Sequence, residues 1–567
     1  MREIVVEVVT AGLRRLAGSG ELPDGVLEAL PEIKVERPRE KSHGDFSTNA
    51  ALVLARHARM KPLDLARKIL AALPAEQTAG ISWDIAGPGF INFHIAPERL
   101  RMLLGEILAR GDRYGHSAAG GGRKVLVEFV SANPTGPMHV GHGRGAVTGD
   151  TIARLLAATG HQVTREYYIN DAGAQVEVLG RSVLHRCREI AGHVETPPEG
   201  WYPGEYVIEI ARALLERHGD PASLPFSQVV DFAIDWVMRE IREDLETMQI
   251  HFDQWFSERF LHVSGGIDRA VEELSKNGWI VQGVLERPKG WDGASPEDYD
   301  GRPQLLFRST HFGDDSDRPL KKGDGSYTYF AADIAYHFDK ARRGFDRLVD
   351  VWGADHGGYV KRVQAALEAL TGKREILDVI LTQMVNLTQG GKPVRMSKRA
   401  GTFVTLRDVV KETGVDAVRF WFLTRSSGAG IDFDLDLAKS RTNDNPVFYV
   451  QYAHARVFSL LTRLQERNLS RDGGDRSRLE APEELDLIRR LGLFPETVEG
   501  AALSREPHRL TYYLSELAAA FHGYYNNHRI LDEDPGLRGA RLELCLAVRQ
   551  VIANGLALLG VSAPESM

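Results

Sequence analysis

Cysteine is almost absent from this chain of 567 residues, which contains only Cys187 and Cys545. Two cysteines cannot form a disulfide framework or a cysteine-rich zinc site. No stretch approaches the roughly 18 uninterrupted apolar residues of a membrane-spanning helix. The first residues alternate charged and apolar side chains and lack the basic and apolar blocks of an export signal. We therefore expect a protein of the reducing cytoplasm that has no membrane partner.

An excess of positive charge is also missing, because 78 acidic side chains outnumber 70 basic ones and give a formal net charge of -8. Any nucleic acid must then be held by local basic patches and not by the charge of the whole molecule. Hydrophobic residues make up 43% of the chain, which is enough for several cores and argues against disorder. At about 100 to 200 residues per domain, the length predicts three to five domains.

Composition and periodicity divide the chain into three parts. Residues 1–117 mix helix and strand signals and end at the glycine-rich segment 117–122, which predicts an α+β domain. Buried-strand runs at 124–130, 347–353 and 376–382 alternate with helical stretches, as is typical of a doubly wound parallel sheet. We expect this sheet domain to span 118–445, with a mostly helical insertion at about 175–300. Helical spacing after Pro446 predicts an all-α bundle over 446–567.

A loop rich in glycine and histidine, 131–145, follows the first strand and opens a helix. His139 and His142 lie three positions apart, so both imidazoles can donate to phosphate oxygens at the free N–H groups of the helix N-terminus. Gly141 lets the backbone approach a phosphate closely. The loop suits a nucleoside triphosphate. The alternative is a pair of surface histidines at the start of a helix.

A second loop, 390–401, has glycines on both sides and carries four cations within eight residues. These cations repel one another unless anionic oxygens approach them. We expect the loop to hold a polyphosphate, and Lys398 has the flexible, compact charge that can follow a departing pyrophosphate. The alternative is a solvated basic loop.

The two loops together, His139-Val-Gly-His142 and Arg395-Met-Ser-Lys398, resemble in order and context the two signatures of class I aminoacyl-tRNA synthetases. Residues 170–175 (Asn-Asp-Ala-Gly-Ala-Gln), the N-terminal segments 43–50 and 87–92, and the tail 450–567 are similar to elements of the arginyl-tRNA synthetase family. The resemblance covers nearly the whole chain and is patchiest at 180–300. It implies a Rossmann-like catalytic domain, an N-terminal domain that binds the outer corner of tRNA, and a helical anticodon-binding domain.

The resemblance also implies the reaction: ATP-dependent ligation of L-arginine to tRNA(Arg) through an arginyl-adenylate, with release of AMP and pyrophosphate. ATP would arrive with Mg²⁺, and neither a tightly bound cofactor nor a protein metal site is expected. The family further suggests a cytoplasmic monomer that activates arginine only with tRNA bound. His139, His142 and Lys398 would be catalytic. The implied ATP-binding residues are Gly141, Arg395, Met396, Ser397, Asp355 and His356.

An acidic residue inside an apolar strand indicates the amino-acid pocket. Glu128 lies within the run 125–130, where an ionised carboxylate is costly unless a cation pairs with it. A substrate guanidinium would match a carboxylate bidentately, and the alternative is an internal salt bridge to an arginine of the chain. Tyr329 and Asp333 share a helix face if the helix begins near Thr328. The resemblance assigns Glu128, Asn133, Tyr329 and Asp333 to arginine binding.

Three positions depart from the family pattern. Many members lack the signature lysine and carry another lysine three residues before the first signature histidine, whereas here Lys398 is present and Gly136 stands at the earlier position. Arg395 replaces the first lysine of the second signature, which keeps the charge and changes its geometry. Ala174 stands where the family often has asparagine.

The tail brings aromatic, amide and arginine side chains close together. Such a surface can stack on unpaired bases and bond their edges, although tyrosines at helical spacing are also typical of a core. The expected RNA contacts are Tyr524, Asn527, Arg529 and Met567 in the tail and Asn49 in the first domain.

Three other functions stay open. A class I synthetase for another amino acid is disfavoured, because Glu128 and Asp333 together would destabilise a neutral side chain. A non-catalytic RNA-binding paralogue would not need both phosphate-binding loops. A simple nucleotidyltransferase would share the histidine loop but not the helical tail.

Overall fold

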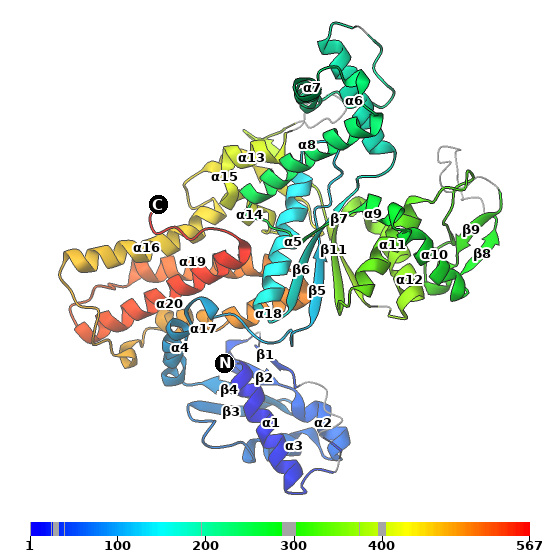
Figure 1. Ribbon diagram of the computed structural model, residues 1–567. Helices are drawn as coiled ribbons and strands as arrows, with labels where there is room; N and C mark the ends of the chain where they lie inside the picture. Colours follow the sequence, from blue (N-terminus) through cyan, green and yellow to red (C-terminus); the bar gives the residue numbers. More distant parts are fainter. Residues whose placement is uncertain are drawn as a thin grey trace.

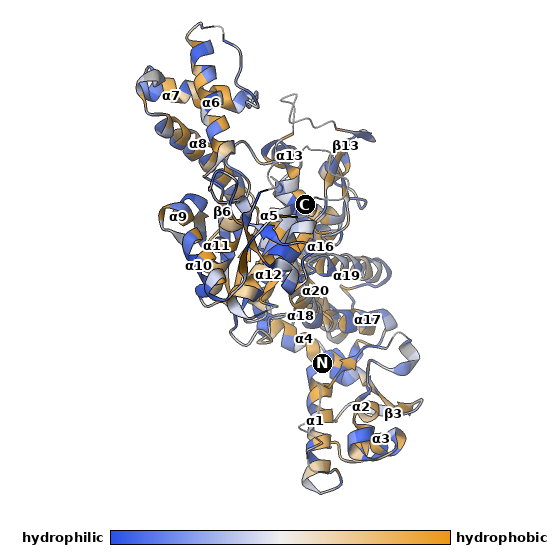
Figure 2. Ribbon diagram, turned by 90° about the vertical axis from the view of Figure 1, so that its right-hand side faces the viewer, coloured by the Kyte–Doolittle hydropathy of each residue, from blue (hydrophilic) through white to orange (hydrophobic). Residues whose placement is uncertain are grey.

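The computed structural model describes residues 2–23, 25–26, 33–38, 40–193, 195–285, 302–373, 375–394 and 404–567. The molecule is elongated (Figure 1): an N-terminal α+β region lies at one end, and helices α6 (Ala174–Ile190) and α7 (Glu205–His218) lie at the other. Between them, a parallel sheet lies beside the helical tail. The view turned by 90° shows the same succession (Figure 2).

The N-terminal region packs helices on an antiparallel sheet of order β1-β2-β4-β3. Helix α1 (Arg2–Gly18) buries a stripe at helical spacing that includes Val5, Val9 and Leu16. The predicted strand after the Gly-Pro-Gly turn is β4 (Phe90–Ile95). The other elements are β1 (Val35–Glu36), β2 (Phe46–Thr48), β3 (Ile81–Ala86), α2 (Ala50–Ala58) and α3 (Pro62–Ala71).

The next helix, α4 (Pro97–Arg110), ties this region to the tail, because it packs against α17 (Pro482–Leu491) and α20 (Pro535–Leu559). The buried Arg101 side chain donates to the Leu479 carbonyl at 3.1 Å, and the Tyr114 hydroxyl donates to Leu491 O at 3.1 Å. The Asn554 amide donates to Gly111 O and Tyr114 O, both at 2.9 Å. The tail therefore holds the connection that leaves the N-terminal region.

The central sheet is parallel, with strand order β12-β11-β5-β6-β7. The chain runs outward from β5 through β6 to β7 and later returns to the other side of β5, so the order reverses between β5 and β11. Ligands of such sheets bind at the carboxyl ends of the strands near this reversal. The strands are β5 (Lys124–Glu128), β6 (Gln162–Ile169), β7 (Gln254–Ser257), β11 (Arg347–Gly353) and β12 (Leu377–Thr382).

Helices cover both faces of the sheet because its central strand is apolar on both sides. Val125 and Val127 join one core and Leu126 joins the other. Helix α5 (Val140–Ala158) lies against the first face, and Gly149 lets it approach, since a Cβ there would lie 2.2 Å from the Phe129 ring. Helices α11 (Tyr329–Arg342) and α12 (Val360–Thr371) belong to the second core.

The described part of the expected insertion at about 175–300 is mostly helical, but it does not lie wholly outside the main sheet. Helices α6, α7 and α8 (Phe226–Thr247) form an arm, but the chain then returns to the main sheet as β7 and continues into α9 (Glu258–Val263) and α10 (Gly266–Lys276). A small antiparallel sheet follows, made of β8 (Ile280–Gly283), β9 (Gln304–Phe307) and β10 (Arg318–Pro319). Strands of four residues or fewer carry too little periodicity to be distinguished from helix.

The predicted strand at 376–382 is followed by a third sheet, of order β14-β13-β15, and by the helical tail. In α20, an apolar window long enough to cross a membrane is 61% buried in the fold, as in the core helix of a bundle. The remaining elements are β13 (Val385–Gln389), β14 (Lys392–Pro393), α13 (Leu406–Thr413), α14 (Val415–Phe422), β15 (Ile431–Asp434), α15 (Leu435–Lys439), α16 (Pro446–Glu466), α18 (Phe494–Ser504) and α19 (His508–Asn527).

Candidate active site

The two predicted histidines lie side by side at the N-terminus of α5, with ring centroids 3.7 Å apart. His139 is the N-cap, and its Nδ1 accepts the Gly141 N–H at 3.1 Å. His142 Nδ1 accepts the His139 N–H at 3.3 Å. A neutral imidazole whose Nδ1 accepts a hydrogen bond carries its proton on Nε2. The local backbone thus sets both rings as Nε2–H donors beside the free N–H groups of a helix start.

A strained turn leads from β5 to this helix. Val130 and Ser131 have φ angles of 69° and 41°, in the left-handed region that costs a branched side chain most. Ser131 Oγ donates to Glu128 Oε1 at 2.7 Å and accepts the Tyr168 N–H at 3.1 Å. These two bonds hold the turn at the carboxyl edge of the sheet, where the Asn133 amide reaches Gln175 Oε1 at 2.9 Å.

The segment that follows the second signature loop contacts the first loop. The backbone of Thr405 forms a bridge with His139, and Leu406 N donates to Met138 O at 2.8 Å. The buried Arg144 side chain of α5 donates to Gln383 O at 2.7 Å and to Ser426 O at 3.0 Å. It thereby joins α5 to the backbone of these two later segments. Arg395, Met396, Ser397 and Lys398 lie outside the described residues.

Glu128 is buried and already paired within the chain. Its Oε2 accepts from the Lys340 ammonium, which also donates to Asp350 Oδ1 at 2.9 Å. His337 Nε2 lies 2.8 Å from Asp350 Oδ2, and His337 Nδ1 lies 2.8 Å from the Asp333 carbonyl oxygen. Burial lowers the pKa of Lys340, but Asp350 and Glu128 outweigh it and raise that pKa above its ordinary value. The ammonium is therefore charged in this cluster.

Glu128 forms the internal salt bridge that the sequence left open as an alternative. Its contact with the arginine substrate stays a prediction. Its partner is a lysine and not an arginine. Lys340 lies seven residues after Asp333 and hence on the same face of α11, a spacing that the sequence already contained.

Asp333 has no salt bridge among the described residues, and its contact with arginine stays a prediction. Helix α11 begins at Tyr329 with Thr328 as its N-cap, which puts Tyr329 and Asp333 on one face. Asp333 Oδ2 accepts the Tyr359 hydroxyl at 2.6 Å, and burial raises the pKa of Asp333. Tyr329 is 45% exposed, with its hydroxyl 3.6 Å from the position of a Cβ on Gly173. Asp355 and His356 are exposed in the turn after β11, with His356 Nε2 3.5 Å from Asp355 Oδ2.

Sequence reasoning missed Glu258, which is 4% exposed and begins α9 directly after β7. The Tyr168 hydroxyl donates to it, and the Asn170 amide nitrogen, in the orientation that satisfies its neighbours, lies 2.8 Å from Oε2. Burial raises the pKa of Glu258 to about 7, and the carboxylates of Asp333 and Asp171 add to the rise. The sequence does place a glutamate directly after the aromatic segment of β7. That position is informative only if β7 is recognised as a strand.

The predicted RNA contacts divide by exposure. Tyr524 is 1% exposed and its hydroxyl donates to Glu484 in the bundle, so it is a core residue and its predicted RNA contact is wrong. Asn527, Arg529 and Met567 are exposed, and Asn49 is half-buried at the start of α2. The RNA contacts of these four residues stay predictions.

A reversing parallel sheet with paired histidines at the start of its first helix, followed by a helical tail, is the arrangement expected of a class I aminoacyl-tRNA synthetase. Family models match three segments: the "Arginyl tRNA synthetase N terminal domain" at 7–95, "tRNA synthetases class I (R), catalytic domain" at 103–193, and the "DALR anticodon binding domain" at 450–567.

Full-length relatives carry the same assignment. An arginine–tRNA ligase of Magnetococcus marinus is 57% identical, with 100% of both chains covered. The crystal structure of a putative arginyl-tRNA synthetase from Campylobacter jejuni has a TM-score of 0.74 at 32% identity, covering 83% of this chain and 100% of that one. The Thermus thermophilus arginyl-tRNA synthetase shares the fold over 100% of both chains, with a TM-score of 0.73 and 23% identity. The chain belongs to the arginyl-tRNA synthetase family.

The predicted family, multidomain α/β fold class and enzymatic activity are thereby confirmed. The reaction is the ATP-dependent joining of arginine to tRNA through an adenylate, which is general in this family. Its substrates are arginine, ATP and tRNA.

Proposed function

We propose that the carboxyl edge between β5, β6, β7 and β11 holds ATP and arginine during adenylate formation. The observation that carries the proposal is the pair of stacked imidazoles, each held by the backbone as an Nε2–H donor. These donors suit phosphate oxygens on which charge develops as pyrophosphate leaves. Lys398 would add the mobile cation. Gly141, Asp355, His356, Arg395, Met396 and Ser397 are the proposed further contacts to ATP.

The arginine carboxylate attacks the α-phosphorus of ATP, and pyrophosphate departs with the bonding electron pair. The terminal adenosine hydroxyl of tRNA then takes the arginyl group, and AMP leaves. Because phosphoryl transfer needs little covalent help, positioning supplies most of the catalysis. Magnesium would accompany ATP and neutralise part of the triphosphate charge.

Arginine itself would be oriented by Asn133, Tyr329 and Asp333, which lie on neighbouring elements of the same edge. Glu128 would act indirectly, by positioning Lys340 and the strained turn at Ser131, because its carboxylate bonds to both.

We propose three functional parts, 1–117 for the outer corner of the tRNA, 118–445 for catalysis and 446–567 for the anticodon. Exposed Asn527, Arg529 and Met567 support RNA contact in the third part, as half-buried Asn49 does in the first. We further propose that the enzyme acts as a monomer in the cytoplasm.

Exchange of pyrophosphate into ATP, measured with arginine and tRNA(Arg), tests the assignment of roles. We expect His142→Ala and Lys398→Ala to lower the exchange rate by about 100- to 1000-fold, the usual effect of losing one preorganised donor. The melting temperature should stay within a degree or two of the wild-type value. A wild-type rate in either variant would remove that residue from the mechanism. Exchange with each other amino acid measures specificity.

A further inference from the structure

Tyr206, in the first turn of α7, reaches from the helical arm to the loop that leads to the signature histidines. Its hydroxyl donates to the Thr135 carbonyl oxygen at 2.7 Å, a short distance along the chain before His139. Burial raises the pKa of Tyr206, so the hydroxyl keeps its proton and remains a donor at physiological pH. The bond joins two segments that lie 71 residues apart in the sequence.

Two glycines make room for the Tyr206 ring. A Cβ on Gly136 would lie 3.1 Å from the hydroxyl oxygen and 3.2 Å from Cζ, and a Cβ on Gly204 would lie 2.5 Å from Cε1. Neither glycine has a positive φ, so the backbone conformation at these positions does not require glycine. The fit of the tyrosine ring accounts for both missing side chains, which come from distant parts of the sequence.

The arm holds the middle of the loop between β5 and α5. Asn133 donates to Gln175 at the start of α6, and Thr135 accepts from Tyr206 at the start of α7. The loop then continues into His139, the N-cap of α5. The position of the arm therefore affects the position of the first imidazole.

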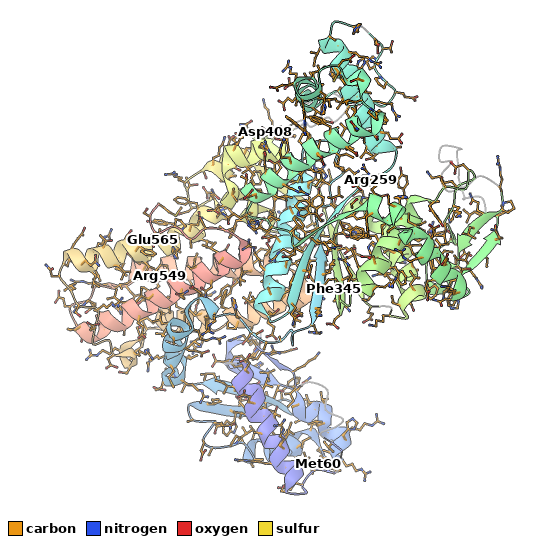
Figure 3. All side chains as sticks on the ribbon, in the orientation of Figure 1. Met60, Arg259, Phe345, Asp408, Arg549 and Glu565 are labelled. Atoms are coloured by element: carbon orange, nitrogen blue, oxygen red, sulfur yellow. The ribbon has the colours of Figure 1, made fainter. Side chains whose placement is uncertain are left out.

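Ion pairs hold the arm against the rest of the molecule. Arg259 in α9, labelled in Figure 3, donates to Asp231 Oδ1 in α8 at 2.7 Å and to the Asp171 carbonyl oxygen at 3.1 Å. Farther along α8, Asp244 pairs with Arg407 of α13, the helix that begins after the second signature loop. The arm thus contacts segments next to both signature loops, and Tyr206 extends from a supported element.

We infer that Tyr206 is a positioning residue for adenylate formation. By holding Thr135, its hydroxyl fixes the loop that places His139, and the His139 N–H in turn donates to His142. A displacement of about 1 Å at a catalytic site can cost about 100-fold in rate, so a bond that fixes this loop affects catalysis without touching substrate. The inference rests on the proposed role of the two histidines.

Tyr206→Phe is the decisive variant, because it removes the hydroxyl and leaves the ring in its place. In pyrophosphate exchange with arginine and saturating tRNA(Arg), kcat should fall about three- to tenfold, the usual effect of one neutral hydrogen bond. The KM values for ATP and arginine should change less than about twofold, because the lost interaction acts in the transition state.

Tyr513→Phe is the matched control. The Tyr513 hydroxyl likewise donates to a backbone carbonyl, that of Arg490 at 3.0 Å, but the bond lies within the tail. Tyr513→Phe should leave kcat unchanged. Because each variant loses one hydrogen bond of the same kind, their melting temperatures should fall by similar amounts.

Gly136→Ala gives a second readout that a purely structural role would not produce. Its methyl group would press on the Tyr206 hydroxyl, so in the wild-type background it should lower kcat about as much as Tyr206→Phe does. In the Tyr206→Phe background the ring is no longer bonded to Thr135 and can shift. Gly136→Ala should then lower kcat by less than about a further twofold.

A wild-type kcat in Tyr206→Phe, an equal fall in Tyr513→Phe, or independent effects of Gly136→Ala and Tyr206→Phe would overturn the inference. So would a raised arginine KM at unchanged kcat, which would assign the hydroxyl to substrate binding. A slow His142→Ala beside a wild-type Tyr206→Phe would overturn this inference alone. If His142→Ala itself exchanged at the wild-type rate, the proposed role of the histidines would fail and the inference with it.

Discussion

Helix α11 borders two acidic clusters that solve the same electrostatic problem in opposite ways. Near the end of the helix, the buried acids Glu128 and Asp350 share the ammonium of Lys340. Around Asp333, near the helix start, the described residues give Glu258 and Asp333 neutral hydrogen-bond donors and nearby imidazoles, and no salt bridge to a lysine or arginine. The first cluster contains its own cation, whereas the described residues place no lysine or arginine in a salt bridge with Glu258 or Asp333.

The first cluster contributes to the stability of the fold. The Lys340 ammonium and Asp350 fix α11 on the sheet. His337 bonds to Asp350 through Nε2 and to the Asp333 carbonyl oxygen through Nδ1. The cluster around Lys340 therefore helps to fix the backbone of α11 at Asp333.

Removing the internal cation should give the largest effect. Lys340→Met leaves Glu128 and Asp350 buried without a partner, so we expect a loss of about 3 to 5 kcal/mol in the free energy of unfolding. Urea titration of the free protein measures it. Lys340→Arg keeps the charge and should lose less. Equal stability of Lys340→Met and wild type would show that the two clusters do not differ as described.

The pH dependence of arginine use should be the next largest effect. The pKa of Glu258 is about 7, so the carboxyl edge of the sheet gains negative charge, which favours a cationic substrate, as pH rises toward 7. We expect kcat/KM for arginine to rise up to about tenfold per pH unit toward pH 7 and then level off. In Glu258→Gln the dependence should flatten, while a slope that persists would assign the titration to another group.

The raised pKa of Glu258 also predicts how the stability of the fold changes with pH. Because its pKa is raised on folding, the stability that Glu258 contributes is present below its unfolded value of about 4.3 and is lost as pH rises through about 7. The pKa of Asp350 is lowered, by Lys340 and His337 against the effect of burial, so its contribution is lost only in acid.

The smallest effect should come from the turn that joins the clusters to the histidine loop. Ser131→Ala removes one hydrogen bond to Glu128 and one from Tyr168, and should cost about 1 to 2 kcal/mol in unfolding free energy. The exchange rate should fall severalfold with little change in the arginine KM, because His139 and Asn133 are displaced and the carboxylates are not. A raised arginine KM at an unchanged rate would contradict this.

Much of this arrangement could be read from the sequence. Long or apolar elements were predictable, including β5, β11, the tail helices and the phase of α11 that pairs Tyr329 with Asp333. The short strand β7 was not, because four residues carry no usable period, and with it Glu258 was lost. Glu128 was correctly predicted to be buried, but its partner lies 212 residues away, and tertiary packing alone decides that it is Lys340.

The hydrogen bonds and packing between the tail and the segment after α4 predict that a shortened protein would be unstable. Cutting before residue 446 would remove Asn554, the partner of two backbone carbonyls, and the apolar neighbours of α4. The remaining fragment would carry a bare hydrophobic face beside unbonded peptide groups, a combination that favours aggregation. The central sheet is therefore not expected to remain folded and soluble without the tail. The last helices support the segment that joins the N-terminal region to the sheet.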